Sequence, residues 1–167
     1  QAVYKFKPVP GRLERIDSKK GFNVFVDYAH TEDALNNVLK SLRSLNPRRI
    51  ITVFGCGGER DRKKRPKMGR VATELSDFSL ITNDNPRSED PEKIIGEIKK
   101  GIRCNAYAVV LDRSRAIKKA ILMAKKNDIV LIAGKGRVQS PFHRATVRLI
   151  WDWGASKKPV DMLSTGF

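Results

Sequence analysis

The chain has 167 residues, which is enough for one domain of ordinary size with a buried core, and a second full domain is not expected. It contains no apolar run near the length of a membrane span and no leader of the signal-peptide type, so we predict a cytoplasmic protein that does not enter the membrane. The formal net charge of +16 favours polyanionic partners, which makes nucleic acid a secondary candidate partner. Cys56 and Cys104 lie far apart without metal-ligand spacing, which argues against a zinc site and a disulfide scaffold.

The first part of the chain predicts a linker followed by a strand and a helix. Residues 1–11, QAVYKFKPVPG, are rich in proline and indicate a linker from a missing upstream domain. The turn-rich segment that follows, as far as Gly21, is compatible with a short hairpin arm. Asn23 to Asp27 predicts the first strand, and Thr31 can cap a helix whose apolar residues repeat at helical spacing.

The stretch IITVFGCGGERDRKKRPKMG, residues 50–69, organises the rest of the chain. Its apolar start predicts a buried parallel strand, and the glycines after it permit positive φ and close approach of the backbone to a ligand. Ligands of open α/β sheets bind outside the carboxyl ends of the strands, so we expect the charged loop to project into a crevice before a helix begins at Pro66. A solvated charged surface is the alternative, and Cys56 is expected to be a small buried residue. The glycines are Gly55, Gly57 and Gly58, and the charged loop runs from Glu59 to Arg65.

The second half of the chain continues the alternation of strands and helices. Strands are predicted at Phe78 to Thr82, Tyr107 to Leu111 and Asp128 to Ala133, and Asp90 and Asp112 can cap the intervening helices. Five strands and four helices with short connections predict an α/β fold, a doubly wound and mainly parallel sheet of five to six strands with helices on both faces. Because the strand ends carry glycine or polar clusters, the candidate chemistry is expected at one edge of this sheet.

These elements divide the chain into a linker, a domain and a tail. Residues 12–136 are predicted to form the domain, and residues 137–167 an atypical C-terminal tail without clear periodicity. Alternation over Ala145 to Trp151 is compatible with one more strand, and a poorly ordered terminus is the alternative. No role is assigned to His143 in this tail.

Five motifs stand at or near the predicted strand ends: PGRLERID, VDYAHTEDAL, VFGCGGERDRKKRPKMG, ITNDNPRSEDP and LIAGKG. In this order and spacing, over about Val9 to Gly136, they resemble the C-terminal domain of the Mur ligases, in the UDP-N-acetylmuramoyl-tripeptide synthetase (MurE) branch that adds meso-diaminopimelate. The resemblance implies the third domain of an ATP-dependent ligase of peptidoglycan synthesis. In that family ATP phosphorylates the D-glutamyl carboxylate of UDP-MurNAc-L-Ala-D-Glu, and the diamino acid attacks the acyl phosphate.

The resemblance also implies how the domain meets ATP. The central domain of the family supplies the phosphate loop and the magnesium ligands, and this sequence contains no G-x-x-x-x-G-K-[ST] motif. ATP and Mg²⁺ are therefore cofactors of the full-length enzyme, the upstream Mur ligase domains are partners, and the isolated domain, with no assigned catalytic residue or metal ligand, is expected to be inactive. Arg12, Asp27 and His30 match positions that close onto ATP, where a guanidinium suits phosphate oxygens and a carboxylate suits ribose hydroxyls. From its position alone, His30 is also a plausible hydrogen-bonding group at a helix start.

A second set of residues is implied to form the diaminopimelate pocket. Arg87 of the DNPR motif can pair with the distal carboxylate of the diamino acid in a bidentate manner, and lysine-adding relatives lack this arginine. Asp84 and Asn85 are implied to orient the charged end, while Arg60 and Gly134 complete the pocket. A simple turn before a capped helix is the alternative for this motif, and it leaves Arg87 unexplained.

The resemblance ends after Gly136. In the family a His-Glu pair follows, and its glutamate holds the substrate ammonium; here Arg137 and Val138 stand instead, which predicts weaker diaminopimelate binding by about 2 to 5 kcal/mol.

This departure and the positive charge favour an alternative, a non-catalytic MurE-like module that binds a partner or nucleic acid, in the plastid stroma if it resembles the plastid proteins. The intact DNPR, GR and DYAH motifs favour the ligase. A stand-alone dinucleotide-binding domain is excluded, since no G-x-G-x-x-G with a suitably spaced acidic residue follows any strand.

Overall fold

The computed structural model describes residues 12–18 and 20–134, and their strands form one six-stranded sheet in the order β1-β2-β6-β3-β4-β5. β1 pairs with β2 in antiparallel fashion, and every other neighbouring pair is parallel. The turn-rich segment after the linker therefore does form a hairpin arm, as predicted. The strands are β1 (Glu14–Asp17), β2 (Asn23–Asp27), β3 (Arg49–Phe54), β4 (Phe78–Ile81), β5 (Tyr107–Val109) and β6 (Asp128–Ala133).

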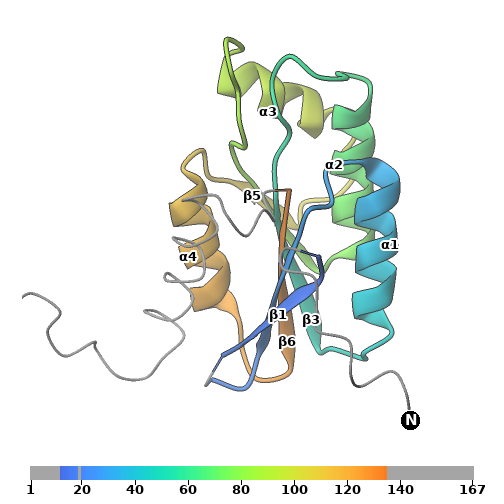
Figure 1. Cartoon of the computed structure of the whole chain (residues 1–167), viewed down its shortest axis with the longest axis vertical. Helices are drawn as coiled ribbons and strands as arrows, with labels where there is room; N and C mark the ends of the chain where they lie inside the picture. Colours follow the sequence, from blue (N-terminus) through green and yellow to red (C-terminus); the bar gives the residue numbers. More distant parts are fainter. Residues whose placement is uncertain (1–11, 19, 135–167) are drawn as a thin grey trace, which may run out of the picture.

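Helices cover both faces of the sheet, as the doubly wound prediction required. Among the described helices, α1, α2 and α3 lie on one face and α4 lies on the other (Figure 1). Each face of the sheet has its own hydrophobic core, and β3 contributes side chains to both. Ile50 and Phe54 pack under α1, α2 and α3, while Ile51 and Val53 pack under α4. The helices are α1 (Glu32–Arg43), α2 (Lys64–Leu75), α3 (Pro91–Lys99) and α4 (Arg113–Met123).

Of the four helices in the described residues, three are capped at their start by the residues that the sequence indicated. Thr31, Asp90 and Asp112 each accept a hydrogen bond from a backbone N–H of the first helical turn. α2 differs, because it begins at Lys64 rather than at Pro66 and has no side-chain cap. The predicted start was wrong because Pro66 lies within the first turn, where its missing N–H removes no helical bond.

The parallel strands bring their carboxyl ends to one edge of the sheet. The ends of β2, β3, β4 and β6 lie next to one another in the order β2-β6-β3-β4, so the loops that follow them share this edge. The possible strand at residues 145–151 and the tail lie outside the described residues. No helix in the described part of the chain is both long and apolar enough to cross a membrane.

Candidate functional site

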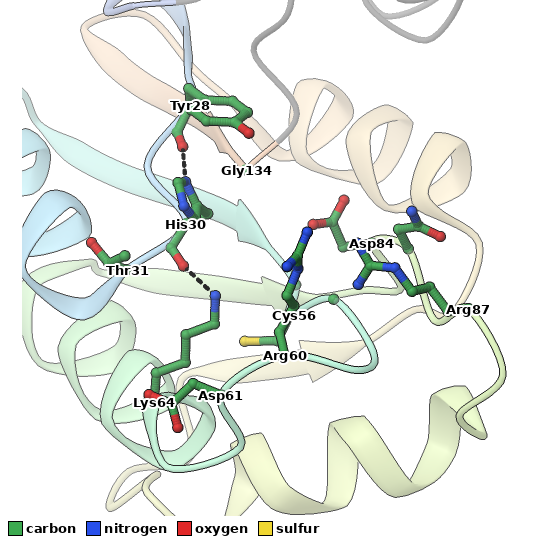
Figure 2. Close-up of a pocket in the computed structure, with 13 residues that line it drawn as sticks. Tyr28, His30, Thr31, Cys56, Arg60, Asp61, Lys64, Asp84, Arg87 and Gly134 are labelled. Carbon is green, nitrogen blue, oxygen red and sulfur yellow. Dashed lines mark hydrogen bonds between the residues drawn. The ribbon is translucent and has the colours of Figure 1, made fainter.

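A pocket of about 610 Å³ opens at this edge, between the loops after β2, β3, β4 and β6. It brings together six of the eight residues predicted to bind ligands, whereas Arg12 and Asp27 do not line it. In Figure 2 Arg60, Asp84 and Arg87 gather at one end of the pocket, and Tyr28 and His30 lie at the other. The six predicted residues in the lining are His30, Arg60, Asp84, Asn85, Arg87 and Gly134, and the others are Tyr28, Thr31, Gly55, Cys56, Gly57, Asp61 and Lys64.

The glycines after β3 let two loops meet. A Cβ on Gly55 would lie 2.2 Å from the carbonyl oxygen of Thr82, and a Cβ on Gly58 would lie 1.8 Å from that of Pro86. In the described chain only Gly21 and Gly134 are glycines with positive φ. Gly55, Gly57 and Gly58 therefore do not use the positive φ that glycine permits, and their close approach is to the neighbouring loop.

Hydrogen bonds hold these two loops together. The Gly58 N–H donates to the carbonyl oxygen of Asn85 at 2.8 Å, and Arg87 Nη1 donates to the carbonyl oxygen of Gly58. Ser88 Oγ donates to the carboxylate of Glu59, which lowers the pKa of Glu59 below its ordinary value. Since Arg60 and Arg87 belong to these loops, the bonds restrain the backbone segments that carry the two arginines. The Arg87 bond uses one of the five N–H groups of its guanidinium.

A buried arginine lies beneath the same loops. The Arg65 side chain is fully buried, and its Nη1 and Nη2 each donate to the Glu89 carboxylate at 2.9 Å. Nη1 also donates to Glu97 at 2.8 Å, and Nη2 donates to the carbonyl oxygen of Gly57 at 3.2 Å. The prediction that the charged loop projects into a crevice as far as Arg65 was therefore wrong, because two carboxylates of a distant segment draw this guanidinium inward.

This ion pair shifts the pKa of both partners. Hydrogen bonding by Arg65 lowers the pKa of Glu89 to about 2, with the Glu59 N–H as the next contribution. The same bond raises the pKa of Arg65 above its ordinary value, against the opposing effect of burial. Arg62, which is largely exposed, adds contacts to Glu89 at 3.4 Å and to Glu97 at 3.1 Å. Arg65 and Glu89 therefore both carry charge at neutral pH.

A second buried arginine supports the pocket from below. Arg113 is 7% exposed, and its Nη2 donates to the carbonyl oxygen of Ala133 at 2.8 Å. Burial lowers the pKa of Arg113, and the charge of Asp84 opposes that shift. A Cβ on Gly134, where φ is +112°, would lie 3.6 Å from Asp84 Oδ2 and 3.8 Å from Arg113 Nη2. The sequence reading missed Arg113, because nothing in one sequence distinguishes a buried arginine after an N-cap from an exposed one.

The residues predicted to meet ATP lie at the carboxyl end of β2. Asp27 is 9% exposed, and its carboxylate accepts the N–H groups of Leu13 and Ala29, both at 2.7 Å. The bond to Leu13 ties the hairpin arm to this strand end and keeps the exposed Arg12 beside it. His30 is exposed and stacks edge-on with Tyr28, with ring centroids 4.8 Å apart.

Lys64, which belongs to the charged loop predicted to project into a crevice, lines the pocket at the same end as His30. Its Nζ donates to the carbonyl oxygen of His30 at 2.8 Å, which joins the first turn of α2 to the loop after β2 (Figure 2). This bond connects the two segments that form the pocket wall at this end.

Cys56 lines the pocket but is buried, as the sequence predicted. Its exposed fraction is 2%, and its thiol contacts Met68 Sδ at 3.7 Å. Burial raises the pKa of the thiol to about 12, so it stays protonated and unreactive at neutral pH. Within the described residues, no group of three or more His, Cys, Asp or Glu side chains is placed to hold a metal ion.

The domain that carries this pocket is similar to known proteins in sequence and in structure. The family model for the Mur ligase glutamate ligase domain matches residues 11–136. A UDP-N-acetylmuramoyl-L-alanyl-D-glutamate--2,6-diaminopimelate ligase of Solibacter usitatus is 55% identical over 138 residues, and one of Syntrophomonas wolfei is 51% identical over 138 residues. Each alignment covers 81% of this chain and 28% of the relative, so the chain spans less than a third of the length of these curated relatives. A solved structure of a ligase with the same name matches with a TM-score of 0.73 and 44% identity, over 80% of this chain and 28% of that chain.

Proposed function

The chain belongs to the Mur ligase family through its glutamate ligase domain. From this premise we propose that it is the C-terminal domain of a diaminopimelate-adding ligase of peptidoglycan synthesis. In this proposal the domain binds meso-diaminopimelate and closes over ATP and UDP-MurNAc-L-Ala-D-Glu, which other domains of the full-length enzyme hold. A cytoplasmic location is part of the same proposal. The relatives, which are named as ligases, favour this function over a non-catalytic binding module.

One observation carries the proposal, namely the convergence of Arg60, Asp84 and Arg87 in one pocket. The two arginines offer guanidinium groups to a carboxylate, and Asp84 offers a carboxylate to an ammonium. A diamino acid with a distal carboxylate carries both charges at that end of its chain. We therefore assign Arg87 to the distal carboxylate, Asp84 and Asn85 to the neighbouring charged groups, and Gly134 to a backbone contact.

The carboxyl end of β2 fits a nucleotide. Arg12 and His30 are exposed there, and Asp27 uses two of the several lone pairs of its carboxylate for backbone N–H groups. We propose that Arg12 binds phosphate or ribose oxygens, that His30 contacts the nucleotide, and that Asp27 orients a ribose hydroxyl. When bound, ATP supplies the phosphoryl group that activates the D-glutamyl carboxylate.

The metal and the phosphate loop belong, in this proposal, to another part of the enzyme. Resemblance to the family assigns the magnesium ligands to the central domain, so this domain alone binds substrate without turning it over. Its own contribution is to hold the diamino acid and to present the amine to the activated carboxylate.

Calorimetric titration of the chain with meso-diaminopimelate tests the proposal. We expect saturable binding, and Arg87→Ala should weaken it roughly 10- to 100-fold, the effect of losing a charged hydrogen-bonded pair. Arg103→Ala is the matched control, because Arg103 is exposed, does not line the pocket and removes the same charge.

The competing function is binding of a nucleic acid. A DNA titration at several salt concentrations would then give a steep salt dependence, while the amino acid produces no heat. That result, or equal losses of diaminopimelate binding in the Arg87 and Arg103 variants, would reject the proposed function.

A further inference from the structure

One carboxylate connects the two loops that carry the pocket arginines. Glu89 follows Arg87 by two residues, and its side chain is 19% exposed. Its Oε1 accepts the backbone N–H of Glu59 and Nη2 of Arg65, and its Oε2 accepts Nη1 of Arg65. Since Arg65 is fully buried, this contact combines a protected ion pair with a bond to the backbone of the opposite loop.

The backbone on both sides of this contact is strained. Glu59 and Arg87 each have a φ of +51°, in the left-handed region that side chains other than glycine avoid. Such conformations persist only where the surrounding structure holds them in place. The Glu89 carboxylate supplies that restraint at Glu59 directly, and its ion pair with Arg65 anchors the loop that contains Arg87.

The strained positions determine where the two arginines of the pocket point. Arg60 follows Glu59, so the backbone of Glu59 directs the Arg60 side chain. The left-handed conformation of Arg87 brings its own Nη1 onto the carbonyl oxygen of Gly58. A Cβ on Gly57 would lie 3.8 Å from Arg87 Nη1 and 3.9 Å from Arg60 Cγ, which places both side chains over the same short segment.

We propose that Glu89 is a positioning residue that sets the separation of Arg60 and Arg87. Resting on the proposed function, this inference adds that Glu89 determines the choice between a diamino acid with a distal carboxylate and one without it. When Glu89 is lost, Glu59 and Arg87 relax toward negative φ, and the two guanidinium groups no longer face one carboxylate together. An amino acid that lacks the distal carboxylate does not depend on this arrangement.

Glu97 provides a matched control within the same ion cluster. It accepts Arg65 Nη1 at 2.8 Å and is 24% exposed, close to the values for Glu89. It lies in α3, however, and within the described residues its observed contact with the loop that carries Arg60 is to the largely exposed Arg62 side chain at 3.1 Å, not to the loop backbone. Glu89→Ala and Glu97→Ala therefore each remove one carboxylate from the same buried arginine, and only the first removes the acceptor of the Glu59 N–H.

The test compares these two variants with the unmodified chain. Calorimetry with meso-diaminopimelate and with L-lysine gives the affinity ratio of the two amino acids, and NMR hydrogen exchange follows the Glu59 amide. In Glu89→Ala we expect roughly tenfold weaker diaminopimelate binding with unchanged lysine binding, together with roughly tenfold faster exchange at Glu59. In Glu97→Ala both the ratio and the exchange rate should stay within about twofold of the unmodified chain.

Thermal melting of each variant confirms that the titrated protein is folded, since a loss of folded protein would lower both affinities and leave their ratio unchanged. Equal ratios in the two variants, or an unchanged exchange rate at Glu59, would overturn the inference. If the unmodified chain binds neither amino acid, the proposed function fails and the selectivity role fails with it. The exchange rate at Glu59 would still decide separately whether Glu89 holds the loops.

Discussion

Replacing Gly58 with alanine should destabilise the protein, because the added methyl group has no room. The new Cβ would lie 1.8 Å from the carbonyl oxygen of Pro86 and 2.6 Å from its carbonyl carbon. An ordinary contact between carbon and oxygen is about 3.3 Å, so the two loops must separate by about 1.5 Å. Such a shift breaks the 2.8 Å bond from Gly58 N–H to Asn85 and disturbs the contact of Arg87 with Gly58.

The cost follows from these two effects. Overpacking of a well-packed site costs about 1 to 3 kcal/mol, and each lost hydrogen bond adds about 1 kcal/mol. We therefore expect the free energy of unfolding to fall by about 2 to 4 kcal/mol in Gly58→Ala. Urea unfolding of the whole chain, followed by far-UV circular dichroism, measures this change as a lower midpoint at an unchanged slope.

Two other glycines provide controls with different expected signs. Gly96 lies in α3 with no atom within 4 Å of an added Cβ, so Gly96→Ala should stabilise the protein by about 1 kcal/mol through helix propensity. Gly57→Ala should be nearly neutral, because the nearest atom would lie 3.5 Å away. A Gly58→Ala protein as stable as the unmodified chain would refute the account of how the two loops meet.

Three further predictions concern charge and thiol chemistry. The pKa of Glu89 is about 2 in the folded protein against 4.5 ordinarily, so the stability that its pairing with Arg65 adds to the fold is complete above pH 4.5 and disappears toward pH 2. The difference in urea midpoint between the unmodified chain and Glu89→Gln should therefore shrink as the pH falls from 4.5 to 2, and a constant difference would contradict this. Cys104 is exposed, whereas the thiol of Cys56 is buried and has a pKa near 12. Ellman's reagent at pH 8 should therefore modify one thiol per folded chain and two after unfolding, and rapid modification of both thiols in the folded chain would disprove the burial argument. Asp128 is fully buried and pairs with Arg49 at 2.7 Å, so Asp128→Asn should lower the free energy of unfolding by about 3 kcal/mol, and a change below about 0.5 kcal/mol would count against a structural role for this pair.

The fold was predictable from local patterns because the strands are short, apolar and separated by clear stops. The predicted strand at residues 128–133 matches β6, and the one at residues 50–54 differs from β3 by a single residue. The N-caps Thr31, Asp90 and Asp112 were also correct, since a short polar side chain before an apolar repeat is a local signal.

Features that depend on distant partners could not be predicted in this way. Arg65 is buried because Glu89 and Glu97 stand 24 and 32 residues away in the chain, and a run of basic residues gives no sign of such partners. Gly58 is needed for a neighbouring loop rather than for its own φ, which a single sequence cannot distinguish. The residues around Arg87 were identified through motifs shared with a family, and the physical reason for their spacing became apparent only in the packing of the two loops.

The place of β6 in the sheet has a consequence for how the protein is made. β6 is the last strand of the described chain, yet it lies between β2 and β3 and is buried along its whole length. Until it emerges from the ribosome, β2 and β3 each present an open edge, and neither half of the sheet has its central neighbour. Synthesis halted before Asp128 should therefore release an aggregation-prone intermediate, and the native sheet can close only after Ala133 has left the exit tunnel.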